Sequence, residues 1–156
     1  MRKEDLIEGS LVLIPDNCIG IKFTGGQISE SIHFTRTTKT VEAIPINRDE
    51  VQVGLSGFYC NPDCLEGVSL SEEALLCMGF QRTSRVINGY VYDDAFSFHD
   101  NVYVIRRENT FFVVLNNNLV QVGTVHELQK KVFDQRRFML LAKPLDFNTY
   151  LELPVN

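Results

Sequence analysis

The chain has 156 residues, of which 44% are hydrophobic, and a formal net charge of −5. This length fits one domain or two small modules that share a core, and it allows folding without disulfide staples. The excess of 20 acidic over 15 basic residues argues against general nucleic-acid binding, which relies on clustered Lys and Arg side chains. No apolar run approaches the length of a membrane span, so we expect no membrane association.

Residues 1–57 contain short candidate strands, each apolar or alternating and each bounded by turn residues. They are Leu11–Ile14, Ile19–Phe23, Ile28–Phe34, Thr40–Ile44 and Val51–Leu55. In the third of them, Ile28, Ile32 and Phe34 share one apolar face. Gly25-Gly26 permits the positive φ angles of a tight hairpin turn before this strand. The density of short strands and turns predicts a small β-barrel, SH3-like in size.

Residues 58–68 form a turn-rich linker, and residues 69–137 predict a module of helix, β meander and helix. Ser69 and Glu72 make a capping box that starts the first helix, because each side chain can satisfy a free N–H at the helix start. Gly79 is typical of a helix end.

The second half of this module combines a hairpin, central strands and a helix. Asn88-Gly89 is among the strongest signals for a hairpin turn. The runs Val102–Ile105 and Phe111–Leu115 are apolar on both faces, as in strands at the middle of a sheet. Thr124 and Glu127 make a second capping box, which predicts a helix. The resulting fold class is α+β, mainly β.

Residues 138–156 form a C-terminal extension that is too apolar for a solvated terminus, and it includes Val155. We expect this extension to pack either on its own domain or on a partner. The candidate partner-binding residues are Phe138, Leu140, Leu145, Phe147, Tyr150 and Leu151.

The four cysteines include one metal-like spacing, Cys60-x3-Cys64. Structural zinc needs four converging ligands, usually in two close pairs. The second pair is missing, because Cys18 lies in a candidate strand and Cys77 lies on the core side of a helix. We therefore expect ordinary buried thiols, no metal and no cofactor.

Two other places in the sequence contain residue types that could form a chemical site. Asp93–Asp100 gathers three carboxylates and His99, which could hold a cation, but the spacing fits no cation loop, and a solvated loop is the preferred interpretation. His126 lies beside Glu127 without the sequence context of a nucleophile, so we expect a partly exposed residue in the first turn of a helix. The sequence thus predicts no enzyme.

Arg36-Thr37-Thr38-Lys39 is predicted to be a small basic loop between two strands. Cations that flank hydroxyl groups could hold a phosphate, which makes Arg36 and Lys39 the candidate ligand contacts. A solvated hairpin loop is the favoured interpretation, since no glycine-rich phosphate cradle lies nearby.

Three motifs carry a family resemblance. Glu66–Phe80 contains a Leu-Ser-Glu-Glu helix start and a Gly-Phe end, and Val125-His126-Glu127-Leu128-Gln129 opens the second helix after a β meander. This arrangement resembles small proteins of gut-bacterial phages and prophages. Asp5–Val12 is similar to their opening, which leads into a small barrel. The chain lacks the prolines that precede the first helix in those proteins, and its C-terminal extension is unusual among them. The resemblance implies a phage context, and its motifs are structural rather than catalytic.

Two function hypotheses follow. The preferred one is a non-enzymatic phage protein that acts by protein–protein contact or self-assembly, as an accessory structural component of the virion. The alternative is a cytosolic protein that binds a nucleotide or signalling molecule through Arg36 and Lys39, such as an inhibitor of host defence. These hypotheses place the protein in the virion or in the host-cell cytoplasm.

Overall fold

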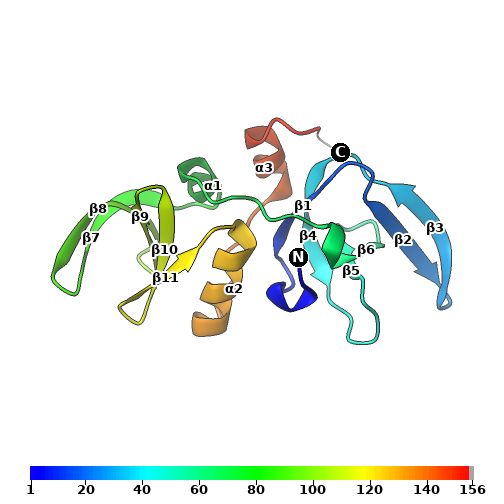
Figure 1. Ribbon diagram of the computed structural model, residues 1–156, viewed down its shortest axis with the longest axis horizontal. Coiled ribbons are helices and arrows are strands. Elements are labelled where there is room, and N and C mark those ends of the chain that lie inside the picture. Colours follow the sequence, from blue (N-terminus) through cyan, green and yellow to red (C-terminus); the bar gives the residue numbers. More distant parts are fainter. Residues whose placement is uncertain (155–156) are drawn as a thin grey trace.

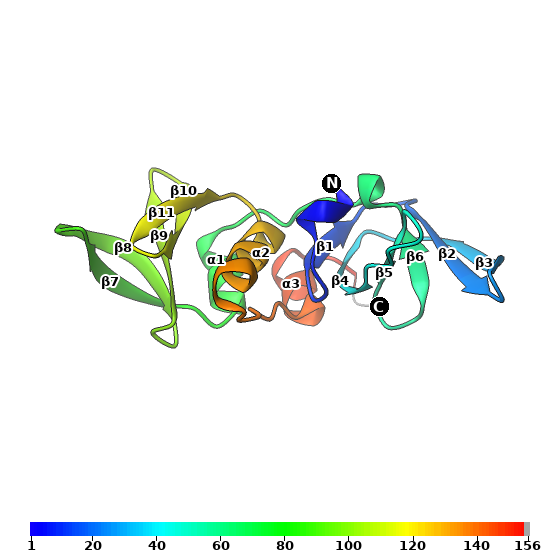
Figure 2. The ribbon, with the colours of Figure 1, turned by 90° about the horizontal axis from the view of Figure 1, so that it is seen from below.

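The computed structural model describes residues 1–154, so Val155 of the predicted extension lies outside the described residues. Two antiparallel sheets lie at opposite ends of an elongated molecule, with three helices between them (Figures 1 and 2). The mainly β, α+β prediction is confirmed. Neither sheet is closed, so the SH3-like barrel predicted for residues 1–57 is not confirmed.

The N-terminal sheet has six strands in the order β1-β4-β5-β6-β2-β3. Their bounds are β1 (Leu11–Ile14), β2 (Ile19–Thr24), β3 (Gln27–His33), β4 (Thr37–Ala43), β5 (Val51–Val53) and β6 (Phe58–Cys60). Strand β6 occupies the start of the predicted linker, and it pairs with both β5 and β2.

The C-terminal sheet is a five-stranded meander in the order β11-β10-β9-β8-β7. Its strands are β7 (Gln81–Ile87), β8 (Tyr90–Phe98), β9 (Val102–Arg107), β10 (Thr110–Leu115) and β11 (Asn118–Val122). The helices are α1 (Glu72–Cys77), α2 (Val125–Arg136) and α3 (Pro144–Tyr150), with 3-10 turns η1 (Lys3–Asp5) and η2 (Pro62–Cys64). No helix within residues 1–154 is both long enough and apolar enough to cross a membrane.

Strand β1 is buried on both faces. Val12 and Ile14 pack in the core of the N-terminal sheet with Val41. Leu11 and Leu13 point to the opposite face, because side chains alternate along a strand, and they join a central core around the helices. Strand β1 therefore contributes side chains both to the core of the N-terminal sheet and to the central core around the helices.

The C-terminal sheet also has two apolar faces. Phe96 joins the central core, whereas its neighbour Ala95 joins a separate cluster on the other face. Asn88 Nδ2, in the predicted Asn-Gly turn between β7 and β8, donates to Asn117 O in the turn between β10 and β11 (3.1 Å). The sheet curls around its second cluster until these two turns meet.

Helix α1 begins two residues later than predicted. Ser71 is the N-cap, and its Oγ accepts a hydrogen bond from Ala74 N (3.0 Å). Ser69 instead forms an isolated β-bridge with Thr124. That long-range pairing holds Ser69 in an extended conformation, which explains the shift. The second capping prediction is confirmed, since Thr124 Oγ1 accepts from Glu127 N (3.3 Å).

The predicted C-terminal extension packs on its own chain. Leu140 and Phe147 are fully buried in the central core, while Phe138, Tyr150 and Leu151 are partly buried against it. Helix α3 contacts both α1 and β4. Leu140 and Phe147 therefore do not reach a partner in this structure. Leu145 is the one residue of the predicted partner-binding set that is exposed (58%).

The buried side chain of Gln129, on α2, is bonded only to backbone groups. Its Oε1 accepts from Leu11 N (2.9 Å), and its Nε2 donates to Gly9 O (3.1 Å) and to Leu140 O (2.8 Å). A single amide thus joins α2, the outer edge of β1 and the segment before α3.

Asn148 plays a similar part on α3. Its Oδ1 accepts from Thr38 N (2.9 Å) and Thr38 Oγ1 (2.7 Å), and its Nδ2 donates to Thr37 Oγ1 (3.2 Å). Both buried amides connect the helices to the N-terminal sheet, and the oxygen and nitrogen of each amide have at least one hydrogen-bond partner. Hydrogen bonds to its polar atoms offset the cost of burying an amide in an apolar core.

Candidate functional site

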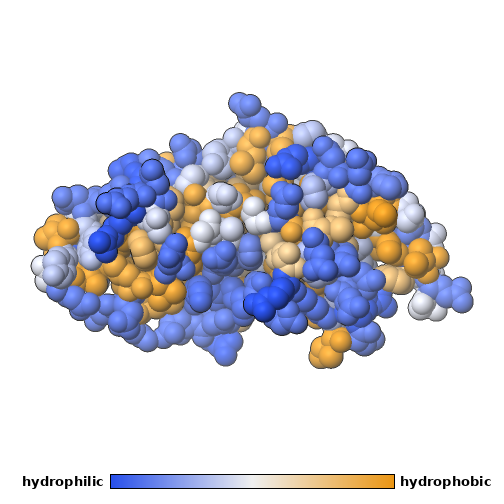
Figure 3. Space-filling model, in the orientation of Figure 1, coloured by the Kyte–Doolittle hydropathy of each residue, from blue (hydrophilic) through white to orange (hydrophobic). Residues whose placement is uncertain are grey.

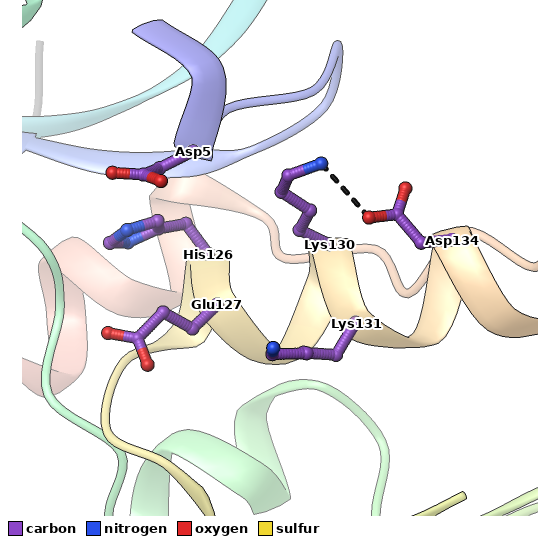
Figure 4. Close-up of a pocket in the computed structure, with 6 residues that line it drawn as sticks. All are labelled: Asp5, His126, Glu127, Lys130, Lys131 and Asp134. Atoms are coloured by element: carbon purple, nitrogen blue, oxygen red, sulfur yellow. Dashed lines mark hydrogen bonds and ion pairs between the residues drawn. The ribbon is translucent and has the colours of Figure 1, made fainter. Parts of the chain in front are cut away.

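A pocket of about 320 Å³ lies where η1 packs against the first turns of α2 (Figure 4). Its lining residues are Asp5, His126, Glu127, Lys130, Lys131 and Asp134. Figure 4 shows Asp5 close to the His126 ring, and Lys130 paired with Asp134 (3.0 Å). Three carboxylates face two lysine ammonium groups in this lining, so the pocket has a small excess of negative charge and is suited to no strongly anionic ligand.

His126 is buried (6% exposed), which corrects the prediction of a partly exposed residue. Its Nδ1 lies 3.0 Å from Thr124 Oγ1, the hydroxyl that accepts from Glu127 N as the helix N-cap. The Thr124 hydroxyl either donates to Nδ1 or accepts from it, according to the tautomer of the ring. Burial lowers the pKa of His126, against the opposing charges of Glu127 and Asp5. The hydroxyl caps the start of α2, and the imidazole is hydrogen-bonded to that hydroxyl.

The predicted loop Arg36–Lys39 is mostly strand. Thr37 and Thr38 are buried at the start of β4, and their hydroxyl groups are bonded to Asn148. Arg36 lies 3.9 Å from Glu66 in an exposed ion pair. Lys39 lies further along β4 against Gly54. The two cations therefore do not flank free hydroxyl groups, and the prediction of a basic loop is wrong.

The predicted solvated loop Asp93–Asp100 lies largely in strand β8, which runs to Phe98. Asp94 receives a bidentate contact from Arg106, with Nε to Oδ2 at 2.7 Å and Nη2 to Oδ1 at 3.1 Å. Arg82 lies 3.7 Å from the same carboxylate and also pairs with Glu72 of α1. These ion pairs hold α1 against the sheet. Among residues 1–154, no group of three or more His, Cys, Asp or Glu side chains is arranged to hold a metal ion.

The structure brings together three thiols that the sequence pattern kept apart. Cys18 and Cys60 are buried in the core of the N-terminal sheet, and Cys64 is exposed at the end of η2. Burial, with the neighbouring Cys64 thiol, raises the pKa of Cys18 to about 11. The predicted pair Cys60-x3-Cys64 was only part of this group, since the position of Cys18 depends on how β2 pairs with β6.

Apolar side chains are exposed on the hairpins at the two ends of the molecule. Val86 and Val91 oppose one another across the β7–β8 hairpin, and they are 60% and 64% exposed. Tyr90 is also exposed, but it is paired with Ile87 and therefore points to the opposite face of the hairpin. Ile19 and Ile28 are exposed on the β2–β3 hairpin, which corrects the buried apolar face predicted for Ile28. Figure 3 shows apolar surface toward both ends.

Searches for similar proteins found no matching family model, curated protein or solved structure.

Proposed function

We propose that this chain is a non-enzymatic, phage-encoded protein that acts by protein–protein contact, as an accessory structural component of the virion. The observation that carries the proposal is the exposed apolar pair Val86 and Val91 on the β7–β8 hairpin. The phage context comes from the sequence motifs alone. The protein would then reside in the virion or, before assembly, in the host-cell cytoplasm.

The hairpin offers a compact contact surface. Directly opposed side chains on two strands share one face, so Val86 and Val91 form a continuous apolar surface. Burying a Val side chain contributes roughly 1.5 kcal/mol or more. Asn88 and Gly89 fix the turn between them with positive φ angles. A rigid apolar hairpin of this kind is suited to insertion into a neighbouring protein.

The opposite end carries a second such hairpin, β2–β3, in which Ile28 is 62% exposed. Two apolar hairpins at the two ends of an elongated molecule suit a protein that bridges neighbours in an assembly (Figure 1). In this proposal, residues 1–57 are SH3-like only in their size and their short strands, because the sheet itself is open.

Mass spectrometry of particles of a phage that encodes the chain tests the proposal. We expect its peptides at a fixed ratio to the major capsid protein. The double variant Val86→Thr/Val91→Thr keeps the β-branched shape but lowers apolarity. We expect it to reduce that ratio at least about tenfold, equivalent to about 1.4 kcal/mol of binding free energy.

Ile46→Thr is the matched control, because Ile46 is fully exposed on the loop between β4 and β5, outside the β7–β8 hairpin. This variant should leave the ratio unchanged. Absence of the wild-type chain from particles would contradict a virion role. Equal incorporation of the double variant would contradict the hairpin as the contact.

A thermal-shift panel of nucleotides separates this proposal from the alternative of a signal-molecule binder. A ligand of the folded state raises the melting temperature by mass action. We expect no shift that depends on Arg36 or Lys39, because the hydroxyl groups between them are already bonded to Asn148.

A further inference from the structure

Strand β7 forms one edge of the C-terminal sheet, and its seven residues keep a regular backbone. The irregularity in its pairing with β8 lies on β8. Two residues of β8 lie between Tyr92 and Ala95, whereas the facing part of β7 has only Ser84 between Thr83 and Arg85. The extra residue, a β-bulge, therefore belongs to the inner strand. Strand β7 also contains no proline, so it keeps the form that another strand needs for pairing.

The backbone groups of every second residue of β7 point away from the sheet. Because a two-residue turn joins β7 to β8, the N–H and C=O groups of Ile87 face β8. The direction alternates along the strand, so the N–H and C=O groups of Arg82, Ser84 and Val86 face the open edge. Within residues 1–154, the one partner of these groups is the exposed Thr83 hydroxyl, which donates to Ser84 O (3.3 Å).

The other edge strand of this sheet, β11, is partly closed. It leads into Gly123, whose N–H donates to Glu127 Oε2 (3.2 Å) and whose C=O accepts from Leu70 N (2.9 Å). Helix α2 and the segment before α1 therefore occupy the end of that edge. Most of β7, in contrast, is exposed.

The two charged side chains of β7 do not block its edge, although charges on edge strands usually oppose pairing. The guanidinium group of Arg82 pairs with Glu72 and lies 5.5 Å from the centre of the Phe96 ring on β8. The guanidinium group of Arg85 lies 4.2 Å from the centre of the Tyr103 ring on β9. Both groups lie over inner strands of the sheet, so neither projects beyond the edge.

The side chains on the two faces of β7 define the kind of strand that fits beside it. On one face Val86 opposes Val91 of β8, so an apolar residue opposite Val86 extends this row to a third strand. On the other face, Arg85 has no carboxylate within ion-pair distance among residues 1–154. An acidic residue opposite Arg85 supplies that carboxylate.

We infer that β7 accepts an extended segment of a neighbouring protein as a sixth, antiparallel strand of this sheet, and that apolar and acidic residues alternate in the segment. The inference rests on the proposed function, because it names the kind of partner that the β7–β8 hairpin contacts. Main-chain hydrogen bonds to Arg82, Ser84 and Val86 supply affinity, and the alternating side chains supply specificity.

A second copy of this chain fits the edge less well. Antiparallel pairing of two β7 strands about Ser84 places Thr83 of one copy opposite Arg85 of the other. The two Arg85 side chains are then diagonal neighbours, and neither meets a carboxylate of β7, because β7 has none. The charge pattern therefore favours a different polypeptide.

Titration of the full-length chain with synthetic peptides tests the inference without a phage particle. The probe is a short peptide of alternating Val and Glu with blocked termini. Two further probes of the same sequence carry N-methyl groups, one on its valine nitrogens and the other on its glutamate nitrogens. In the register in which valine opposes Val86, the valine N–H groups face β7 and the glutamate N–H groups face solvent.

NMR titration of the Ser84 and Val86 amides gives the affinities. We expect N-methylation of valine to weaken binding at least about tenfold, because it removes main-chain hydrogen bonds, and N-methylation of glutamate to change it less than about twofold. Equal affinities of the three probes would overturn the inference. Absence of binding at millimolar concentrations of the unmodified probe would overturn it as well.

The acidic character of the partner has its own measurement. A probe with Gln in place of Glu should bind the wild-type chain about threefold more weakly, in keeping with the energy of a cross-strand ion pair. In Arg85→Gln, the two probes should bind equally. A preference for the acidic probe that persists in Arg85→Gln would contradict the pairing with Arg85.

Ser84→Pro carries the test into particles. Proline removes the outward N–H of residue 84 but keeps Val86 and Val91, and edge strands accept proline where the N–H faces solvent. We expect this variant to lower the ratio of the chain to the major capsid protein at least about tenfold. Ser84→Ala keeps the N–H and is the matched control, with an unchanged ratio. Circular dichroism melting confirms that both variants fold, and the peptide titration of the wild-type chain does not depend on them.

Failure of this inference is distinguishable from failure of the proposed function. Absence of the wild-type chain from particles contradicts the virion role, and the peptide titration then decides strand addition by itself. Normal incorporation of Ser84→Pro, with loss of Val86→Thr/Val91→Thr, would overturn strand addition and leave the hairpin as the contact. A dimer in sedimentation that Ser84→Pro dissociates would make a second copy the occupant, and would also overturn the inference.

Discussion

The two edge strands of the N-terminal sheet, β1 and β3, differ in how far other parts of the chain cover them. At the β1 edge, Leu11 N is bonded to the Gln129 amide, and Leu13 exchanges backbone hydrogen bonds with Glu66 (2.9 Å each). At the other edge, β3 is almost wholly exposed and ends the strand order. One edge is covered by the rest of the chain, and the other faces solvent.

The exposed edge carries two features that oppose pairing with another strand. The pairing of β2 with β3 shifts register between Lys22 and Phe23, where Ser29 Oγ donates to Lys22 O (3.2 Å). Glu30 follows this bulge and is exposed. Bulges and charges on edge strands discourage edge-to-edge association. This sheet therefore protects one edge by covering it with other parts of the chain, and the other edge by a β-bulge and a charged side chain.

Removing the covering amide should have the largest effect. Gln129→Leu leaves Leu11 N, Gly9 O and Leu140 O without their partner in a buried region. Stranded buried polar groups cost about 1–3 kcal/mol each, so we expect a loss of roughly 3–5 kcal/mol in the free energy of unfolding. Urea denaturation measures it.

Gln135→Leu is the control for that variant, because Gln135 is exposed on the same helix. Its effect should stay within about 0.5 kcal/mol. Similar losses for the two variants would show that the amide does not hold the β1 edge.

A smaller loss is expected for Asn148→Leu, which removes the contacts to Thr37 and Thr38. The hydroxyl groups can rotate toward other acceptors, so we expect roughly 2–3 kcal/mol. Thermal melting with a two-state fit gives the value. Thr149→Ala, on the exposed side of the same helix, should change stability by no more than about 0.5 kcal/mol, and an equal loss there would refute the role of Asn148.

Glu30→Val tests the open edge. The segment Ile28-Ser29-Glu30-Ser31-Ile32 reads the same in both directions, so antiparallel pairing of two copies about Glu30 would oppose the two carboxylates. Removing that repulsion should strengthen self-association at least about tenfold, or about 1.4 kcal/mol. Sedimentation against concentration measures it, with Glu73→Val on α1 as the control. An unchanged monomer in Glu30→Val would mean that the bulge alone protects the edge.

The smallest expected effect concerns pH at the covered edge. Burial lowers the pKa of His126, so the folded chain binds this proton less readily than the unfolded chain. Stability from this group is present above the ordinary His pKa of about 6.5 and is lost as the pH falls toward the lower value of the folded state. The groups that face it are Asp5, Glu127 and the N-terminal amine.

Leu11 N is hydrogen-bonded to Gln129, which lies one turn after His126 on α2. Hydrogen exchange of the Leu11 amide therefore reports this loss of stability. We expect faster exchange in wild type than in His126→Gln as the pH falls from about 7 to about 5, after correction for intrinsic rates. Amides on the outer edge of β3 should show no such difference. Equal pH dependence in both proteins would rule out His126 as the cause.

The sequence predicts those parts of the fold that depend on neighbours along the chain. The turn at Asn88-Gly89, the helix start at Thr124 and the strand Leu11–Ile14 are all confirmed, because backbone preference and local capping suffice to specify them. Long-range pairing decides the rest. Ser69 carries the better capping box, but its bridge to Thr124 leaves Ser71 to cap α1.

The site residues follow the same rule. The Asp93–Asp100 segment is polar enough for a loop, but pairing with β7 and β9 keeps most of it in a strand. The meeting of Cys18 with Cys60 in one core depends on the strand register, which no local pattern encodes. The apolar alternation of Ile19, Ile21 and Phe23 predicts that Cys18 lies on the opposite face from these residues, whereas the structure buries Cys18 (5% exposed) and exposes Ile19 (50%).

Helix α3 lies between β4 and α1, so the last described helix fills a space bounded by two much earlier segments. Synthesis on the ribosome proceeds from the N-terminus, and N-terminal elements usually fold first. Here the first sheet emerges with Thr37, Thr38 and the β1 edge still lacking the side chains that satisfy them. We expect the nascent chain to remain incompletely folded, and open to chaperones and proteases, until residues 144–150 leave the exit tunnel.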